Sequence, residues 1–563
     1  MLLVILSLVF CESDGTFIIT DTHAGEVRGF QIPTNSGSHL NVFLGIPYAE
    51  APVDSLRFAP PVEKDSWRPR ILNATKFGPA CPQVLRSLRN SFGNSFHDVH
   101  EDCLYLNIYA PKNASNPTQT YPVMVWIHGG YFQLGSGSEY DGRILASKGG
   151  VIVVTINYRL GPLGFLSTDD SVSSGNQGVL DQVLALKWIN KNIHNFGGNS
   201  QQVTLFGQSA GGASVSLHMF SPLSTGLFQG LISQSGCAVS PFAVNRPPHS
   251  QLVNTRNLAL MLGCPVLSSK VMVNCLRHKS AEDIVSAAPP RPQLTLPYTP
   301  RVDGYFLHDV PENLIKRGNF NRNIRVMMGY VRDESSIFIP STFDEHGGYD
   351  VTFYDSLLTD LSAGFLHSDK VKSTVMCYYP VELNNTLENA DTYMNLVSDF
   401  EFKFPHINMA SSFVTKGIVT WLYEFNYLSP NYPGPKWRGV YHSSELFFLF
   451  GAPLYSLDPC PGDVHETCPQ IWETIPEWDH KDREMSETII DLWSQFAKMS
   501  SHEISLSLYG GTQWGAFNKD KQFLFIGNST ELRHYTSSPT MDLWDKFDFL
   551  DYYVNPDFHC NLD

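Results

Sequence analysis

Long apolar segments recur along the chain, and glycine or proline bounds most of them. These segments are rich in β-branched residues, and polar side chains do not alternate with the apolar ones. A strand that is buried on both faces has this composition, whereas a strand with one wet face alternates. The pattern therefore predicts central strands at residues 123–128, 151–158, 203–207, 324–329 and 420–425.

Helical segments separate these strands. Residues 178–193 repeat apolar positions at the spacing of one broad helix face, which takes in Leu180, Val183, Leu184, Leu186, Lys187 and Ile189. Strands that alternate with helices form a mostly parallel sheet that helices cover, so the predicted fold class is α/β. No internal repeat, linker or shift in composition divides the chain, which favours one large domain.

Composition and charge narrow the function. Of the 563 residues, 42% are hydrophobic and only 17% are charged, whereas a disordered protein has the opposite balance. The formal net charge is −16. An acidic surplus is repelled by phosphate backbones, so we expect no nucleic-acid partner.

The N-terminus has the pattern of a secretory signal. MLLVILSLVF is an uninterrupted apolar run of signal-peptide length. We expect cleavage between Cys11 and Gly15, so residues 1–15 are interpreted as the signal and 16–563 as a single secreted domain. The alternative is a buried first strand. No later stretch reaches the roughly 18 apolar residues that a membrane-spanning helix needs.

Secretion gives the cysteines and asparagines a further meaning. Cysteines that lie close in sequence can pair in an oxidising compartment, although spacing leaves the connectivity open. The close pairs are Cys81 with Cys103, Cys264 with Cys275 and Cys460 with Cys468, which leaves Cys237, Cys377 and Cys560. An odd remainder indicates a free thiol or a link to another chain. Glycosylation sequons begin at Asn73, Asn113, Asn384 and Asn528.

One pentapeptide indicates a nucleophile. Gly207-Gln208-Ser209-Ala210-Gly211 fits the pattern G-x-S-x-G. It follows a predicted strand and precedes a predicted helix, which is the context of a nucleophile elbow. In that turn the serine hydroxyl stands at a helix N-terminus, where the helix dipole favours negative charge. The pentapeptide alone also arises by chance, but this context favours Ser209 as a nucleophile.

A serine nucleophile needs an oxyanion hole, which is built from backbone N–H groups. One donor is expected from Ala210, the residue after the serine. Others are expected from a glycine-rich loop after an earlier strand, and His128-Gly129-Gly130-Tyr131 supplies such a loop. The alternative is an ordinary Gly-Gly turn, but two separate parts in the expected chain order favour the oxyanion hole.

Longer motifs connect the chain to a known family. Residues 196–211, FGGNSQQVTLFGQSAG, resemble the nucleophile signature of the type-B carboxylesterases, the cholinesterase and carboxylesterase family. Residues 101–107, EDCLYLN, resemble the second signature of that family. The likeness runs from GEVRGF to WRGVYHSSELFFLFG and so covers nearly the whole mature chain. It implies an α/β-hydrolase fold with a large, mainly parallel sheet.

The resemblance also implies a catalytic triad in the order Ser, Glu, His. The family's acid follows a late strand in a Gly-x-x-x-Asp-Glu context, which places it at Glu334 and leaves the neighbouring Asp333 as an alternative. The family's base sits in a Gly-Val-x-His context, which here is His442. With Ser209, these residues would hydrolyse esters through an acyl-enzyme, without a metal or an organic cofactor.

Other family features carry over to matching positions. They are the oxyanion donors Gly130, Tyr131 and Ala210, the disulfides Cys81–Cys103 and Cys264–Cys275, and the buried ion pairs Arg57–Glu101 and Arg159–Asp181. Cys560 is similar to the tail cysteine through which some cholinesterases dimerise. A disulfide-linked homodimer through Cys560 is therefore one hypothesis for the assembly.

Three departures from the cholinesterases concern their choline site. The loop between Cys81 and Cys103 contains no tryptophan and offers only Phe92 and Phe96. Gln208 stands where many members have glutamate. Ile337 stands where cholinesterases have an aromatic residue after the acid. Aromatic faces and negative charge are what hold a cation, so the resemblance predicts poor choline selectivity.

The acyl pocket is changed as well. Leu294 and Leu296 stand where acetyl-selective cholinesterases have two phenylalanines, and Phe242 is expected as another wall. The leading hypothesis is therefore a serine carboxylesterase that hydrolyses small neutral esters and accepts butyryl or longer acyl groups.

Two alternatives remain open. One is a cholinesterase in which Tyr131 or another aromatic side chain replaces the missing tryptophan. The other is a non-catalytic adhesion protein similar to the neuroligins, which often lack the serine or the histidine and usually carry a membrane span. This chain keeps Ser209, Glu334 and His442, and that favours the enzyme.

Overall fold

The computed structural model of the protein describes most of the chain. The described residues are 16–34, 39–84, 98–112, 119–246, 250–288, 296–338, 351–363, 365, 367–382, 386–432, 436–457, 477–500, 505–508, 511–548 and 553–554. The predicted signal peptide, Phe92, Phe96, Asn113, Leu294, Asn384, Cys460, Cys468 and Cys560 lie outside them.

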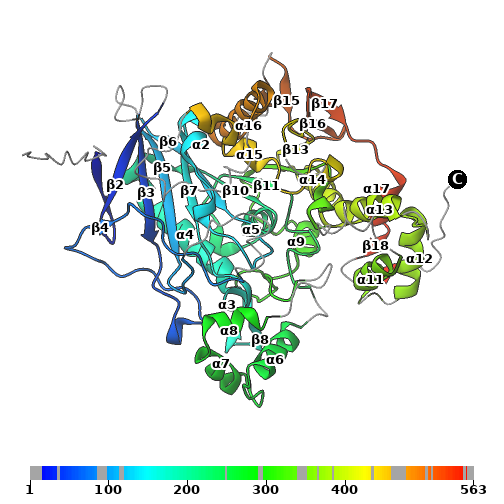
Figure 1. The fold of residues 1–563 in the computed structure, drawn as a ribbon, viewed down its shortest axis with the longest axis horizontal. Helices are drawn as coiled ribbons and strands as arrows, with labels where there is room; N and C mark the ends of the chain where they lie inside the picture. The colour runs from blue at the N-terminus through cyan, green and yellow to red at the C-terminus, as the bar shows by residue number, and fades with distance from the viewer. Residues whose placement is uncertain are drawn as a thin grey trace, which may run out of the picture.

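A 13-stranded mixed sheet runs through the molecule (Figure 1). One edge is antiparallel and consists of β1 (Phe17–Thr22), β2 (Gly25–Pro33), β3 (His39–Pro47) and β5 (Tyr105–Lys112), with β4 (Leu72–Asn73) beside β2. The centre is parallel and follows the order β7 (Ile152–Ile156), β6 (Tyr121–Ile127), β10 (Gly198–Gln208), β11 (Gly230–Gln234), β12 (Arg325–Val331), β13 (Thr420–Phe425) and β16 (Gln522–Ile526). β17 (Thr530–His534) closes the other edge antiparallel to β16. The predicted mainly parallel sheet and its central strands are confirmed.

The central strands are buried on both faces, as their continuous apolar runs predict. In β6, Val123, Val125 and Ile127 belong to one core cluster, whereas Met124 and Trp126 belong to the other. The first cluster also takes in α4 (Gln177–Asn192) and α5 (Ala210–His218), and the second takes in α2 (Arg143–Gly149) and α16 (His480–Lys498). Helices therefore cover both faces of the sheet. The predicted helix at 178–193 is α4, although Lys187 is exposed and does not belong to its buried face.

Two buried ion pairs fasten loops to this core, at the positions that the resemblance implies. Arg159 donates to Asp181 through its backbone N–H, Nε and Nη2 at 2.7–3.0 Å, and the two side chains are only 2% and 0% exposed. Arg57 donates to both carboxylate oxygens of Glu101. Its Nη1 also donates to the carbonyl of Lys279 at 2.6 Å.

The cysteines form the disulfides that the resemblance implies. Cys81 pairs with Cys103, and Cys264 pairs with Cys275. Cys377 is also disulfide-bonded, whereas Cys237 is a buried free thiol. Within the ranges given above, no helix combines the length and the apolar character that a membrane span requires.

The buried pair provides a stability test. We expect Asp181→Asn to lower the free energy of unfolding by about 3–5 kcal/mol, because it leaves the Arg159 charge buried without its counter-ion. Lys191→Ala is the matched control, because Lys191 and Glu63 pair at 2.9 Å with both side chains 52% exposed. That change is expected to cost less than about 1 kcal/mol. Urea unfolding measures both values, and equal losses would contradict the prediction.

Candidate active site

Ser209 lies in a sharp turn between the end of β10 and the start of α5. Its backbone has φ 59° and ψ −124°, a conformation that non-glycine residues avoid and that persists only where the surroundings impose it. A hydrogen bond to the neighbouring strand β11 fixes the turn, because the Ser209 N–H donates to the Gln234 carbonyl at 2.8 Å. A Cβ on Gly211 would lie 1.9 Å from the Ile127 carbonyl oxygen, so that position admits only glycine. This is the elbow geometry that the pentapeptide predicts.

An imidazole–carboxylate pair lies beside this turn. Glu334 begins η5 (Glu334–Phe338), directly after β12, and its side chain is fully buried. His442 Nδ1 lies 2.5 Å from Glu334 Oε2, and the other oxygen of that carboxylate accepts the Val331 N–H at 2.9 Å. With both oxygens used in this way, the carboxylate fixes the orientation of the imidazole ring.

Asp333, the alternative acid, points elsewhere. Its carboxylate lies 2.6 Å from Arg332 Nη2 and accepts the Val440 N–H at 2.8 Å. Asp333 therefore holds the segment that leads to His442 but does not contact the imidazole. Glu334 is the residue in the position of a triad acid.

The second nitrogen of the imidazole is occupied by a residue that sequence reasoning had assigned only to the pocket. Gln208 Nε2 lies 2.9 Å from His442 Nε2. With the amide nitrogen as donor, Nε2 of the imidazole carries the lone pair and Nδ1 carries the proton toward Glu334. Ser209 Oγ makes no hydrogen bond to any residue that the structure describes. Ser209 is buried, with 5% of its surface exposed.

An aromatic ring covers the base. The Phe402 ring centroid lies 5.0 Å from that of His442, and Phe242, the predicted pocket wall, lies 5.6 Å from Phe402. Phe402 comes from η6 (Asp399–Lys403), a π-helical turn before α14 (Phe404–Thr415). Such turns often mark functional sites. Sequence reasoning missed Phe402, because no motif separates it from the other aromatic residues of this segment.

The predicted oxyanion loop adjoins the nucleophile. A Cβ on Gly129 would lie 3.0 Å from Ser209 Cβ, which puts the loop directly against the serine. Gly130 and Tyr131 have φ 101° and 59°, so the chain turns sharply directly beside the serine. Among the described residues, the N–H groups of Gly130 and Ala210 donate to no hydrogen bond. The three predicted donors therefore come from one compact turn and one helix N-terminus.

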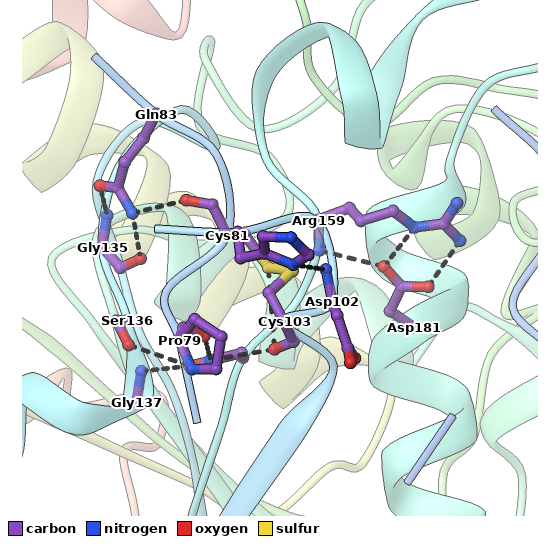
Figure 2. Close-up of a disulfide and its surroundings, with 12 residues drawn as sticks. Pro79, Cys81, Gln83, Asp102, Cys103, Gly135, Ser136, Gly137, Arg159 and Asp181 are labelled. Carbon is purple, nitrogen blue, oxygen red and sulfur yellow. Dashed lines mark hydrogen bonds and ion pairs between the residues drawn. A yellow bond between two sulfur atoms is a disulfide. The ribbon is translucent and has the colours of Figure 1, made fainter. Parts of the chain in front are cut away.

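The Cys81–Cys103 disulfide anchors the far end of this loop (Figure 2). The Gln83 amide donates to the Gly135 carbonyl at 3.0 Å and accepts the Gly135 N–H at 2.9 Å. Asn157 adds a second tie, because its Nδ2 donates to the Cys103 carbonyl at 3.0 Å while its Oδ1 accepts the Gly137 N–H at 2.8 Å. The covalent link and these amides thus fix the backbone that follows the oxyanion loop.

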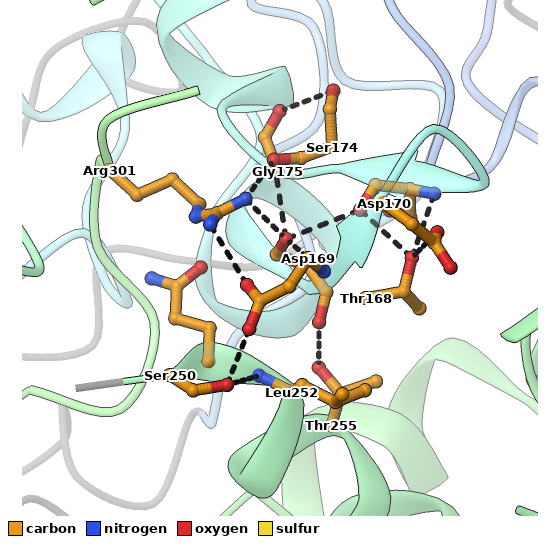
Figure 3. Close-up of polar contacts among 12 residues, drawn as sticks. Thr168, Asp169, Asp170, Ser174, Gly175, Ser250, Leu252, Thr255 and Arg301 are labelled. Carbon is orange, nitrogen blue, oxygen red and sulfur yellow. Dashed lines mark hydrogen bonds and ion pairs between the residues drawn. The ribbon is translucent and has the colours of Figure 1, made fainter. Parts of the chain in front are cut away.

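A polar cluster holds the segment that carries Leu296, the described member of the predicted acyl pair (Figure 3). The Arg301 guanidinium lies 2.9 Å from Ser167 Oγ and 2.9 Å from Asp169 Oδ1. Its backbone N–H donates to Asn176 Oδ1 at 2.9 Å. Leu296 is buried, whereas Ile337, on η5, is half-buried.

A second buried carboxyl lies near the triad acid. Glu445 Oε1 accepts from Gln234 Nε2 at 3.1 Å, and Gln234 Oε1 accepts the Trp493 indole N–H at 3.1 Å. Burial, reinforced by the nearby Glu334 charge, raises the pKa of Glu445 to about 8. Most Glu445 side chains are therefore protonated at neutral pH. In the described part of the chain, no cluster of His, Cys, Asp and Glu could hold a metal ion.

The raised pKa of Glu445 predicts a pH-dependent stability. A carboxyl with a folded pKa of about 8 and an ordinary value of 4.5 binds more protons in the folded state across that window. Stability therefore falls as pH rises from about 4.5 to 8, with a slope that approaches 1.4 kcal/mol per pH unit. Glu445→Gln removes this loss, so we expect the variant to gain stability relative to the wild type over the window.

Thermal melting between pH 5 and pH 8 measures that difference. Glu487→Gln is the control, because Glu487 is 56% exposed and its replacement should show no such trend. A difference between wild type and Glu445→Gln that stays constant with pH would contradict the assignment.

Comparison with known proteins agrees with this architecture. Residues 17–544 match the sequence model of the carboxylesterase family, and the chain belongs to that family. Neuroligin-3 of Mus musculus is 31% identical over 93% of this chain and 68% of its own length. Neuroligin-2 of Mus musculus is 31% identical over 94% and 67%. Acetylcholinesterase of Bungarus fasciatus is 34% identical over 85% and 77%. Because the relatives carry both kinds of name, the choice between hydrolysis and a binding role rests on the site residues.

Proposed function

We propose that the protein is a serine carboxylic-ester hydrolase with Ser209, Glu334 and His442 as its triad. The observation that carries this proposal is the 2.5 Å contact between His442 Nδ1 and the buried Glu334 carboxylate, beside a serine in a strained elbow. A buried carboxylate on Nδ1 leaves Nε2 as the basic nitrogen and stabilises the imidazolium that forms when that nitrogen takes a proton.

The proposed reaction uses these groups in sequence. Ser209 Oγ attacks the ester carbonyl while its proton passes to His442 Nε2. The N–H groups of Gly130, Tyr131 and Ala210 stabilise the tetrahedral oxyanion. The alcohol leaves with the proton from His442, and water hydrolyses the acyl-enzyme by the same steps with water in place of the serine.

A non-catalytic binding protein is the second candidate. The observation that favours it is the match to two neuroligins over more than nine tenths of this chain. Against it, the complete constellation of serine, carboxylate and imidazole serves no purpose in a protein that only binds a partner. Labelling with a fluorophosphonate, which reacts only with an activated serine, distinguishes the two candidates.

The triad gives the first activity test. We expect Ser209→Ala and His442→Ala to lose p-nitrophenyl ester turnover by about 10⁴-fold or more, while folding is kept. Glu334→Gln is expected to be severely impaired, because the imidazole loses its orientation. Ser235→Ala is the matched control, because Ser235 is a buried serine that follows the neighbouring strand β11. Wild-type turnover in Ser209→Ala would refute the assignment.

We further propose neutral carboxylic esters as the substrates. Gln208, which contacts His442, is uncharged, and the residues at the predicted pocket positions 296 and 337 are aliphatic. The measurement compares acetylthiocholine with its uncharged isostere. We expect the kcat/KM ratio to stay below about 30-fold, since a desolvated cation–π site is worth about 2 kcal/mol. A larger preference for the cation would identify a cholinesterase with a rebuilt choline site.

Secretion and glycosylation belong to the same proposal. Cys81–Cys103 and Cys264–Cys275 form disulfides, and Cys377 is also disulfide-bonded. Such bonds persist in oxidising compartments. Asn73 and Asn528, which begin two of the sequons, are both exposed. The homodimer through Cys560 stays a prediction, and non-reducing electrophoresis of the secreted protein tests it.

A further inference from the structure

The proton-accepting nitrogen of the base is covered by the residue that precedes the nucleophile. Gln208 Nε2 lies 2.9 Å from His442 Nε2, and Ser209 Oγ has no hydrogen bond within the described residues. The nitrogen that has to take the serine proton is therefore engaged by an amide of the same turn.

We propose that Gln208 gates the catalytic base: its side-chain amide occupies His442 Nε2 in the resting site and has to leave before Ser209 can be deprotonated. This inference rests on the proposed esterase function, because it gives the displaced contact a role in proton transfer. In this proposal Gln208 acts through its contact with the reacting nitrogen of His442, and its effect is not limited to the lack of the negative charge that glutamate would bring.

The imidazole itself has little freedom to escape this contact. Its Nδ1 is held by Glu334 at 2.5 Å, and the Phe402 ring packs beside it at an angle, with ring centroids 5.0 Å apart. The glutamine side chain ends in a torsion with a broad energy profile, so the amide is the part that moves. A Cβ on Gly129 would lie 3.1 Å from Gln208 Oε1. The amide oxygen is therefore next to the oxyanion loop, and a carbonyl that enters the loop comes close to it.

The amide group suits both protonation states of the base. It donates through Nε2 to a neutral imidazole, and after rotation it accepts through Oε1 from an imidazolium. A carboxylate at this position can only accept, and so favours the imidazolium. A thioether can do neither to a useful extent. Substitution by glutamate and by methionine therefore separates the two roles with little change in volume.

Other titratable groups surround the triad acid and are the same in all variants. They are Glu445 before α15 (Leu446–Leu449), His406 on α14, Tyr330 on β12 and Tyr423 on β13, each of which interacts electrostatically with Glu334. Burial lowers the pKa of His406 to about 4, so it stays neutral at the pH of the assay. A change between variants therefore reports on position 208.

The first test measures the reactivity of the serine. We expect Gln208→Met to be inactivated by a fluorophosphonate about three- to tenfold faster than the wild type, which is the factor that one released hydrogen bond provides. Gln182→Met is the matched control, because Gln182 contacts a different imidazole, His218, at 3.0 Å. It should react at the wild-type rate. Equal or slower inactivation of Gln208→Met, in a variant that melts like the wild type, would overturn the proposal.

The second test needs no turnover. The proton between His442 Nδ1 and Glu334 gives a low-field NMR resonance whose position follows the protonation of the ring. In Gln208→Glu the pH at which this resonance moves should rise by about one unit or more, because an anion then faces Nε2. The midpoint pH of the acid limb of the kcat/KM profile should rise by the same amount.

The two tests separate the inference from the proposed function. If the wild type is not labelled at all while the resonance still shifts in Gln208→Glu, the esterase proposal fails but the Gln208 contact stands. If the wild type is labelled and neither the Gln208→Met rate nor the Gln208→Glu resonance changes, the esterase proposal stands and the role of Gln208 is refuted.

Discussion

The backbone of Ser209 has φ 59° and ψ −124°, a conformation that few residues other than glycine adopt. Close packing of the neighbouring backbone imposes this conformation. A Cβ on Gly207 would lie 2.6 Å from the Gly211 carbonyl, and one on Gly236 would lie 2.2 Å from the Ser209 carbonyl oxygen. The backbones of the Ser209 turn, the Ile127 segment and the Gly236 segment thus pack in direct van der Waals contact. This close approach sets the position of α5, the height of the serine above the sheet and the place of the oxyanion loop, which lies against Ser209 Cβ.

The same dense packing limits how many carboxylates in the site can be ionised at once. In a buried environment two adjacent carboxylates repel strongly, and one of them keeps its proton. Here Glu334 has both oxygens hydrogen-bonded to N–H donors, whereas Glu445 has its pKa raised to about 8 by burial and by Glu334. Gln208 adds no further charge. In the proposed reaction the imidazole takes up and gives back a proton, and the Glu334 carboxylate contacts its Nδ1.

The scaffold and the chemistry are separable in this family. The sheet is shared with relatives that carry the names neuroligin and acetylcholinesterase, so the fold by itself does not define the activity. The features that bear on the proposed chemistry are local. The chain has an amide at position 208, a phenylalanine ring against His442, and a predicted oxyanion loop whose following backbone is tied by Gln83 and Asn157 to the segments joined by a disulfide. These features act on the serine and its partners, and the sheet supplies their fixed frame.

The sequence by itself determined the central strands and the sharp turn that carries Ser209, the proposed nucleophile. Strands buried on both faces need unbroken apolar runs, and the elbow needs glycine where backbones touch, so both leave local patterns. The family motif also distinguished Glu334 from Asp333, and the structure shows only Glu334 on the imidazole. Only the tertiary structure decided that Gln208 covers His442 and that Phe402 packs on it. Gln208 and His442 are 234 residues apart, and a contact between two side chains that distant depends on how the strands are ordered and stacked, which leaves no local pattern to read.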